Sequence, residues 1–248
     1  MKCFFVWSDN LERVKDVRSW LDQLAFEVSS SVINADCIIV VGGDGTMLKA
    51  IHEYWRFNLP FFGINRGTKG FLLNPIATLH DLNLALENYL ECKTVSLRLL
   101  KATFEKVDGA LVEHLAFNDV FIKAEHGAVI WGKVSGDKFP EQNFCGDGLI
   151  VAAPQGSTAY NRSAGGSILP LDHNIFSITT ICPMYLPIRS TVSAQKITLV
   201  IDKGPAIGFA DFFREDPIKS IVIEPGQAQV RLVFIPTYDF EVSRYKLD

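Results

Sequence analysis

A run of five apolar residues followed at once by a glycine-rich loop most constrains what this chain can fold into. The run, Cys37 to Val41 (CIIVV), has no polar position, which is typical of a strand buried on both faces of a sheet. The loop Gly42 to Thr46 (GGDGT) follows it, and helical periodicity then predicts a helix over Met47 to Trp55. A buried strand, a loop and a helix in this order form a β/α unit, which favours a parallel sheet.

The flanking sequence in the first third of the chain repeats this alternation. Apolar or period-2 patterns predict strands at Lys2 to Trp7 and at Leu59 to Ile64, and an amphipathic helix is predicted near Leu79 to Leu90. A further helix is predicted from apolar residues at helical spacing, which are Val17, Trp20, Leu21, Leu24 and Val28. Strands that alternate with helices predict an α/β N-terminal domain with a parallel sheet.

The pattern changes near Val95, after which strand-like runs follow one another with short turns. Runs such as LIVAAP, FSITTI and KITLVI are typical, and helical periodicity almost disappears. We therefore predict an α/β domain over residues 1–94, which carries the GGDGT loop, and a mainly antiparallel, β-sandwich-like C-terminal domain over residues 95–248. The final segment, PTYDFEVSRYKLD, is compatible with packing back on the first domain or with covering a sheet edge.

The composition is that of a globular chain and excludes several classes of protein. In 248 residues, 24 Lys and Arg stand against 28 Asp and Glu, a net charge of −4, so there is no basic field for nonspecific nucleic-acid binding. Uncharged apolar stretches are too short or too interrupted to cross a bilayer. The five cysteines are scattered, without a CxxC pair or histidines at ligand spacing. We expect a cytoplasmic protein with reduced thiols, no zinc site, and no nucleic-acid or membrane partner.

Four stretches carry residues suited to nucleotide chemistry, and the first is the GGDGT loop. Its glycines allow the backbone to approach a ligand, and the N–H groups at the start of the next helix attract phosphate oxygens. Asp44 is unexpected in a loop built for anions, since a carboxylate repels them unless it accepts a proton from a hydroxyl or faces a divalent cation. The alternative is a turn aspartate that caps the helix.

The second stretch, Gly63 to Leu72 (GINRGTKGFL), also directly follows a predicted strand. Its three glycines predict an open, tightly turned loop, in which Arg66 and Lys69 could place positive charge beside a phosphate chain. A solvated surface position is an equally supported interpretation of both side chains. Phe71 and Leu72 fit either a core or the wall of a ligand site.

The third stretch is Asn118-Asp119, two polar residues that interrupt a strand with apolar neighbours, which destabilises the strand unless they have partners. An amide can read a nucleobase edge and a carboxylate can accept from two ribose hydroxyls. The pair therefore suits a nucleoside, and the alternative is a β-bulge or a turn at a strand end.

The fourth stretch runs from Cys145 to Gly166 and is rich in glycine, small residues and hydroxyls. Such residues would expose backbone and short hydrogen-bond donors to a flat ligand. Within it, Asp147 could instead close a turn and Tyr160 could simply pack against its neighbours.

Together the four stretches resemble the NAD kinase family, over about residues 36 to 201. GGDGT alone also resembles lipid kinases of the diacylglycerol and sphingosine type, but GINRGTKGFL and GDGLIVAAPQGSTAYNRSAGG make the likeness specific. The resemblance implies transfer of a phosphoryl group from ATP, or in some members polyphosphate, to the 2′-hydroxyl of the adenosine ribose of NAD, giving NADP. It also implies a divalent metal, Mg²⁺, held mainly by the donor phosphates, and a homodimer or homotetramer.

The resemblance also implies roles residue by residue. Asp44 matches the catalytic aspartate, which deprotonates or orients the 2′-hydroxyl. Positions that match nucleotide-binding or NAD-binding segments are Gly42, Gly43, Gly45, Thr46, Asn65, Gly67, Gly70, Phe71, Leu72, Asn118, Asp119, Asp147, Thr158, Ala159, Tyr160 and Ser163. Asp119 stands where the family usually has Glu, which is one methylene longer, so its ribose contact is expected to be longer or water-mediated.

Three departures from the family pattern bear on the substrates. The usual Thr-Pro-Thr is Ala153-Pro154-Gln155, which removes two hydroxyls beside the nucleotide. Asp211 is followed by Phe212 rather than by Gly or His, and Cys145 stands where many relatives have a basic residue. Donor choice, affinity and discrimination against NADH therefore stay open, while Asp44 is retained.

Two other functions are compatible with parts of the sequence. A lipid kinase would share GGDGT but needs an apolar or interfacial entry, whereas the long small-residue stretch suits a dinucleotide. A noncatalytic NAD(P)-binding regulator would retain the pocket without turnover, and Ala153, Gln155 and Phe212 are its support. Labelled ATP offered with NAD and with lipids separates the two kinases, and NAD binding without ADP release would favour the regulator.

Overall fold

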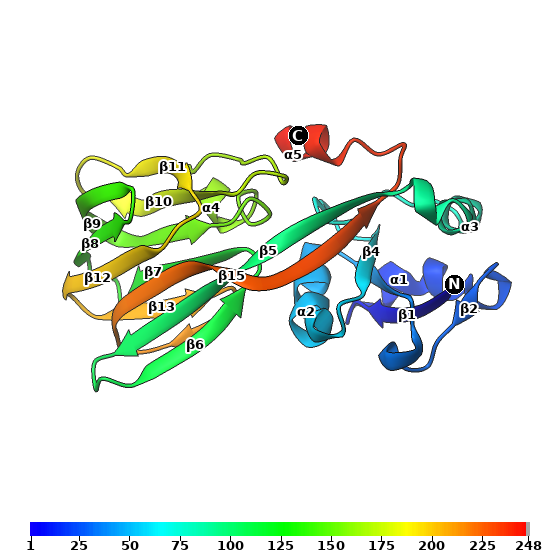
Figure 1. The fold of residues 1–248 in the computed structure, drawn as a ribbon, viewed down its shortest axis with the longest axis horizontal. Coiled ribbons are helices and arrows are strands. Elements are labelled where there is room, and N and C mark those ends of the chain that lie inside the picture. Colours follow the sequence, from blue (N-terminus) through cyan, green and yellow to red (C-terminus); the bar gives the residue numbers. More distant parts are fainter. Residues whose placement is uncertain (247–248) are drawn as a thin grey trace. The chain divides into compact units, whose positions relative to one another are not determined.

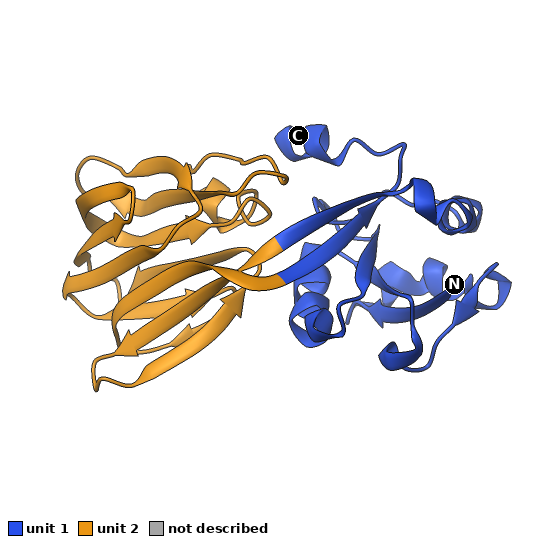
Figure 2. Ribbon diagram, viewed as in Figure 1, with its two compact units in different colours: residues 1–97, 229–248 blue, residues 98–228 orange. Residues whose placement is uncertain are grey.

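In the computed structural model, which describes residues 1–246, the chain divides into two compact units (Figure 2). The first unit contains Met1–Leu97 and the described part of Gln229–Asp248, and the second contains Arg98–Ala228. The division falls inside two long strands, β5 (Lys93–Lys106) and β15 (Ile218–Phe234). The segment that follows β15 therefore belongs to the first unit.

The first unit is built on a parallel sheet in the order β2-β1-β3-β4-β15 (Figure 1). Besides β15, its strands are β1 (Lys2–Trp7), β2 (Glu27–Val28), β3 (Cys37–Gly42) and β4 (Pro60–Asn65). Val40 of β3 pairs with Gly63 of β4, and Leu232 of β15 pairs with Phe61 of β4. β3 is buried throughout, as its unbroken apolar run predicts. The predicted α/β unit with a parallel sheet is confirmed.

Four helices of this unit are α1 (Leu11–Arg18), α2 (Asp44–Tyr54), α3 (Leu79–Glu87) and α5 (Phe240–Tyr245). Short 3₁₀ turns occur at Leu21–Gln23, Val32–Asn34, Trp55–Phe57 and Tyr89–Glu91. No helix within residues 1–246 is both long and apolar enough for a membrane span.

The helix predicted from the apolar spacing between Val17 and Val28 is wrong. α1 begins after Asn10, whose side chain accepts a hydrogen bond from Arg13 N–H and caps the helix, and it ends at Arg18. Trp20 and Leu24 lie beyond this end, yet both pack against the same core as the helix, so a helix-like spacing arises without a helix.

The second unit consists almost entirely of antiparallel strands (Figure 1). Besides parts of β5 and β15, its elements are β6 (Leu111–Ala116), β7 (Asp119–Ala124), β8 (Ile130–Gly136), β9 (Phe139–Ala152), α4 (Tyr160–Ser163), β10 (Ile175–Pro183), β11 (Arg189–Ser193), β12 (Ile197–Lys203), β13 (Ala206–Ala210) and β14 (Phe213–Glu215). β9 pairs with β7, β8 and β10, and every one of these pairs is antiparallel. The predicted antiparallel C-terminal fold is confirmed.

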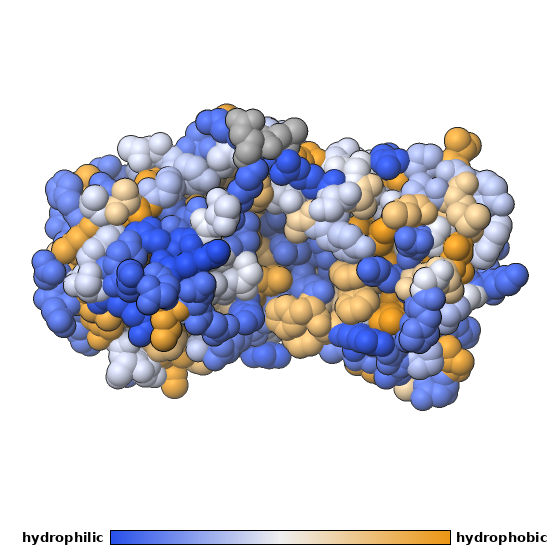
Figure 3. All heavy atoms as spheres, turned by 180° about the vertical axis from the view of Figure 1, so that it is seen from behind, coloured by the Kyte–Doolittle hydropathy of each residue, from blue (hydrophilic) through white to orange (hydrophobic). Residues whose placement is uncertain are grey.

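Each unit has its own hydrophobic core. Val14 and Val17 of α1 and Leu82 of α3 pack with Ile39 and Val41 of β3 in the first unit. In the second unit, side chains of β5, β7, β9, β12 and β15 form a separate core. On the face drawn in Figure 3, apolar and hydrophilic residues are interspersed, as on most folded proteins.

Candidate functional site

Asp44 is the first residue of α2 and lies just beyond the carboxyl end of β3. Both of its carboxylate oxygens accept a hydrogen bond from Phe71 N–H at 3.0 Å, and Oδ1 also accepts one from Leu72 N–H at 3.0 Å. The N-cap of α2 is Gly43, which makes no side-chain capping bond, so Asp44 is not the helix cap that the sequence left open. Its carboxylate is directed at the second glycine-rich stretch.

The surroundings of Asp44 raise the pKa of its carboxyl above the usual value for an aspartate. Burial is the main cause because it disfavours the charged form, and the N–H groups of Phe71 and Leu72 and the positive charge of Arg244 oppose it. A carboxylate whose pKa is raised accepts a proton more readily than an exposed one. Ready uptake of a proton is one property that a general base requires.

The two glycine-rich stretches of the first unit pack directly on each other. Arg66 N–H donates to the Gly42 carbonyl at 2.7 Å, and a Cβ on Gly67 would lie 3.1 Å from the Cα of Gly43. Asn65 supports the turn, because its Oδ1 accepts from Gly67 N–H at 2.9 Å. The structure thus brings Asn65, Gly67 and the Phe71–Leu72 pair against the GGDGT loop at the carboxyl ends of β3 and β4, where open α/β sheets bind ligands.

The side chain of Arg66 is used within the first unit. Its guanidinium forms an ion pair with Asp16 at 2.9 Å, donates to the Ile76 carbonyl at 2.8 Å, and lies 5.4 Å from the ring centroid of Trp20. Lys69, by contrast, is exposed. Arg66 therefore anchors the loop to α1 and to the segment before α3, instead of presenting a free charge to a phosphate.

In the second unit, Asn118 and Asp119 lie at the start of β7. The N–H groups of both residues donate to the carboxylate of Asp211, at 2.8 and 3.2 Å. Burial, and then the negative charge of Asp211, raise the pKa of the Asp119 carboxyl well above its usual range. The Oδ1 atom of Asn118 is buried without a hydrogen-bond partner in residues 1–246. Within residues 1–246, this corner therefore holds one buried acceptor without a partner, Asn118 Oδ1, next to a buried carboxyl with a raised pKa, Asp119.

The fourth stretch begins inside β9 and becomes a turn only after Ala152. Asp147 lies on β9 and is exposed, and it accepts a hydrogen bond from the Cys182 thiol, which is the main reason that the pKa of Cys182 is raised. Tyr160 begins α4, and its ring meets the ring of Phe121 edge-on at 5.1 Å. Of the remaining predicted positions, Thr158 and Ala159 are partly exposed before α4, and Ser163 ends α4 and is exposed.

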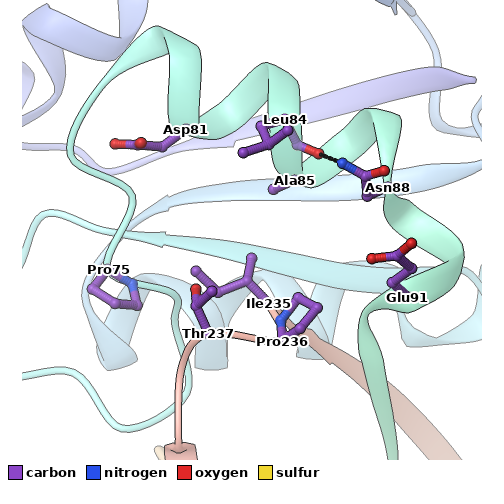
Figure 4. Close-up of a pocket in the computed structure, with 9 residues that line it drawn as sticks. All are labelled: Pro75, Asp81, Leu84, Ala85, Asn88, Glu91, Ile235, Pro236 and Thr237. Atoms are coloured by element: carbon purple, nitrogen blue, oxygen red, sulfur yellow. Dashed lines mark hydrogen bonds between the residues drawn. The ribbon is translucent and has the colours of Figure 1, made fainter.

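Described residues of the first unit line cavities at two places. One of about 460 Å³ has Leu84 and Ala85 of α3 facing Ile235 and Pro236 after β15 (Figure 4), and it includes none of the predicted site residues. The other, of about 370 Å³, adjoins the first turn of α2 and is lined by Val6, Trp7, Asp9, Gly45, Thr46, Lys49, Ala50 and Glu53. This second cavity touches the GGDGT loop. No group of three or more His, Cys, Asp or Glu side chains in residues 1–246 could hold a metal ion.

Comparisons with known proteins show the family of this chain. Family profiles described as the ATP-NAD kinase N-terminal domain and the ATP-NAD kinase C-terminal domain match residues 10–94 and 117–211. An NAD kinase of Rickettsia bellii is 35% identical over 244 residues, covering 94% of this chain and 90% of its own length. One of Rickettsia felis is 35% identical over 217 residues, covering 84% of this chain and 83% of its own.

Solved structures show the same architecture. The crystal structure of an NAD kinase from Archaeoglobus fulgidus in complex with ATP has a TM-score of 0.73 and 28% identity, covering 98% of this chain and 96% of that one. Yeast NADH kinase complexed with NADH has a TM-score of 0.77 at 18% identity, covering 98% and 86%, which is a likeness of fold. The relatives that match this chain are named NAD kinases, which are phosphotransferases. The chain belongs to the NAD kinase family, which confirms the resemblance noted in the sequence, whereas the lipid-kinase and regulator alternatives find no support among these relatives.

Proposed function

We propose that this protein is an NAD kinase, which transfers the terminal phosphoryl group of ATP to the 2′-hydroxyl of the adenosine ribose of NAD and so forms NADP. The observation that carries the proposal is the Asp44 carboxylate, oriented by Phe71 N–H at 3.0 Å beside a glycine-rich loop. Phosphoryl transfer asks the protein mainly to align the nucleophile with the donor and to neutralise charge. An oriented proton acceptor next to open backbone meets both needs.

In the proposed reaction Asp44 accepts the proton of the 2′-hydroxyl as the ribose oxygen bonds to the γ-phosphorus. The bond from the γ-phosphorus to the bridging oxygen breaks, and ADP leaves with the electron pair. The donor phosphates lie against the backbone of Gly42, Gly43, Gly45 and Thr46, at the N-terminus of α2. General-base catalysis of this kind contributes about 10² to 10⁴ in rate.

NAD recognition is assigned first to residues of the second unit. Asn118 and Asp119 offer an amide and a carboxyl to the nucleoside, and the buried Oδ1 atom of Asn118, which has no hydrogen-bond partner in residues 1–246, supports this. We assign the remaining contacts to the positions predicted from the sequence, which are Asn65, Gly67, Gly70, Phe71, Leu72, Asp147, Thr158, Ala159, Tyr160 and Ser163.

Mg²⁺ is proposed to enter with the donor phosphates. Residues 1–246 supply no cage of three or more acidic, cysteine or histidine side chains, and Mg²⁺ commonly keeps waters and phosphate oxygens as ligands. When bound, the ion would neutralise charge on the transferred group. The residues of this chain orient the hydroxyl, accept its proton and contact the phosphates through backbone N–H groups.

The proposed function is tested by supplying purified protein with NAD and Mg²⁺, adding either ATP or polyphosphate, and measuring NADP with an NADP-specific dehydrogenase. We expect NADP with ATP, and the polyphosphate arm reveals whether this donor is also used. NAD and NADH are compared in the same assay. Absence of NADP with both donors would contradict the proposal.

We also propose a homodimer or homotetramer, in the cytoplasm. An exposed apolar surface in the second unit supports self-association. The ring centroids of Trp131 and Tyr185 on this surface are 5.7 Å apart. Met184 and Leu186, the sequence neighbours of Tyr185, are exposed as well. Leu186→Asp is expected to lower the mass measured by light scattering, with the exposed Leu111→Asp as a matched control. Unchanged mass for Leu186→Asp would argue against this surface.

A further inference from the structure

Gln155, one of the departures from the family pattern, is buried and bonded to the backbone just before Asn118. Its side chain is 2% exposed, and Nε2 donates to the Phe117 carbonyl at 2.6 Å and to the Arg98 carbonyl at 3.0 Å. A buried carbonyl without a hydrogen bond destabilises the fold, so both bonds have a structural value. The amide thus ties the turn after β9 to the entrance of β7.

Asp211 binds the backbone N–H groups of the same segment, residues 117–119. The N–H groups of Phe117, Asn118 and Asp119 all donate to its carboxylate, at 2.6, 2.8 and 3.2 Å. Asp211 lies in the turn between β13 and β14 with a left-handed φ of 52°, and its own N–H donates to the Asp119 carbonyl at 3.0 Å. The turn between β13 and β14 therefore places one carboxylate within hydrogen-bond distance of three consecutive backbone N–H groups.

The carbonyl of Asn118 is fixed as well. Ala153 N–H donates to it at 3.0 Å, and Gly156 packs so closely on Asn118 that a Cβ would overlap its carbonyl group. The backbone from Phe117 to Asp119 is thus bonded along both of its polar edges, while the Asn118 Oδ1 atom stays buried without a partner in the described chain. A fixed backbone that carries an unsatisfied acceptor is preorganised for a ligand.

We propose that Gln155 is a positioning residue for NAD, which fixes the Asn118–Asp119 pair through the Phe117 carbonyl. Its amide nitrogen is already used by two backbone carbonyls, so Gln155 acts through the segment and does not need to touch the substrate. This inference rests on the proposed function. Gln155 would thus position the NAD-binding pair from a site where the family usually has the hydroxyl of Thr.

The test compares Gln155→Met with Gln195→Met. Methionine keeps the length of the side chain and removes the amide, and Gln195 provides the matched control because its Oε1 also bonds a backbone group, Lys138 N–H at 2.5 Å. We expect Gln155→Met to raise the KM for NAD by about tenfold, because the Phe117 carbonyl loses its partner and the Asn118–Asp119 pair is no longer held in position. The KM for ATP and the kcat at saturating NAD should stay within about twofold, which separates loss of NAD positioning from general damage. Gln195→Met should leave all three constants unchanged.

A second variant and a second readout keep the inference testable if Gln155→Met folds poorly. Gln155→Asn retains a buried amide that is one methylene too short, and the same rise in KM for NAD is expected. Amide hydrogen exchange of Asn118 and Asp119, measured without substrate, should be faster in either Gln155 variant than in the wild type or in Gln195→Met. The inference is overturned if the wild type is active and a folded Gln155 variant has an unchanged KM for NAD. The proposed function would then remain intact.

If the wild type forms no NADP, the proposed function fails, and amide exchange then decides whether Gln155 fixes the segment. Unchanged exchange at Asn118 and Asp119 would overturn the positioning role, whereas faster exchange in both Gln155 variants would support it.

Discussion

Both carboxylate oxygens of Asp44 accept a hydrogen bond from the same backbone group, the N–H of Phe71, at 3.0 Å. This contact joins two loops that follow neighbouring strands of the parallel sheet, β3 and β4. The orientation of the carboxylate is therefore set by backbone, which no side-chain substitution at Phe71 removes directly.

Asp44→Asn should abolish most turnover and leave NAD binding largely intact. The amide keeps the shape of the side chain but cannot accept the 2′-hydroxyl proton, so kcat should fall by about 10² to 10⁴. Calorimetry of NAD binding and the NADP assay measure the two quantities separately. Asp22→Asn, at an exposed position in a 3₁₀ turn, is the control. Equal losses of binding and turnover in Asp44→Asn would contradict the role of a base.

The pH profile should carry an acid limb that belongs to Asp44. Because burial raises the pKa of this carboxyl, the fraction able to accept a proton falls as the pH drops through a value above the usual ~3.9 of aspartate. We expect kcat/KM for NAD to decline along this limb while circular dichroism shows the fold intact. The residual activity of Asp44→Asn should lack the limb. A wild-type limb centred at or below the usual value would rule this explanation out.

Asp119→Asn should remove a pH dependence of stability. The pKa of Asp119 is raised in the fold, so between the unfolded and folded pKa values the folded state binds more protons than the unfolded state. Its contribution to stability therefore falls as the pH rises from about 4 through the folded pKa. Urea denaturation across this range should show the wild type losing stability relative to Asp119→Asn as the pH rises. Parallel curves for the two proteins would show that Asp119 is not buried in this way.

Gly156→Ala should destabilise the second unit. The added Cβ would overlap the backbone of Asn118, and relief requires either the turn after β9 or the start of β7 to move. Overpacking of this kind costs about 1 to 3 kcal/mol. Gly45→Ala is the control for thermal unfolding, since its Cβ would meet no atom within 4 Å. A Gly156→Ala protein as stable as the wild type would show that this contact is looser than described.

The architecture was predictable from the sequence wherever a local pattern decided it. The apolar run of β3 needed burial on both faces, and the GGDGT loop needed a position at the end of that strand. The helix expected across Val17 to Val28 failed because apolar residues in a turn pack on the same core as those of α1. Local periodicity indicates which side chains are buried. Different backbone conformations can bury side chains that have the same spacing in the sequence.

The supports of the site were harder to predict because they come from distant parts of the chain. The residue type of Arg66 suits a phosphate, yet Asp16 and Trp20 engage its side chain. Gln155 differs in the sequence only by lacking the usual hydroxyl, and nothing local indicates that its amide reaches the Phe117 carbonyl. Arg244, whose charge acts on Asp44, lies on α5 near the end of the chain. Such pairings depend on tertiary structure, which residue types alone do not specify.

The strand that completes the first unit's sheet, β15, is synthesised after all the other strands of residues 1–246. Until residues 231–233 emerge, β4 has no partner along that edge, and Asn74 lacks the Val233 carbonyl to which its side chain donates at 2.9 Å. The ribosome must therefore synthesise the second unit before the parallel sheet of the first unit, which carries Asp44, can add its β15 strand. An expression fragment ending near residue 97 would expose an unpaired strand edge and should aggregate, whereas one that joins residues 1–97 to 229–248 retains the missing strand.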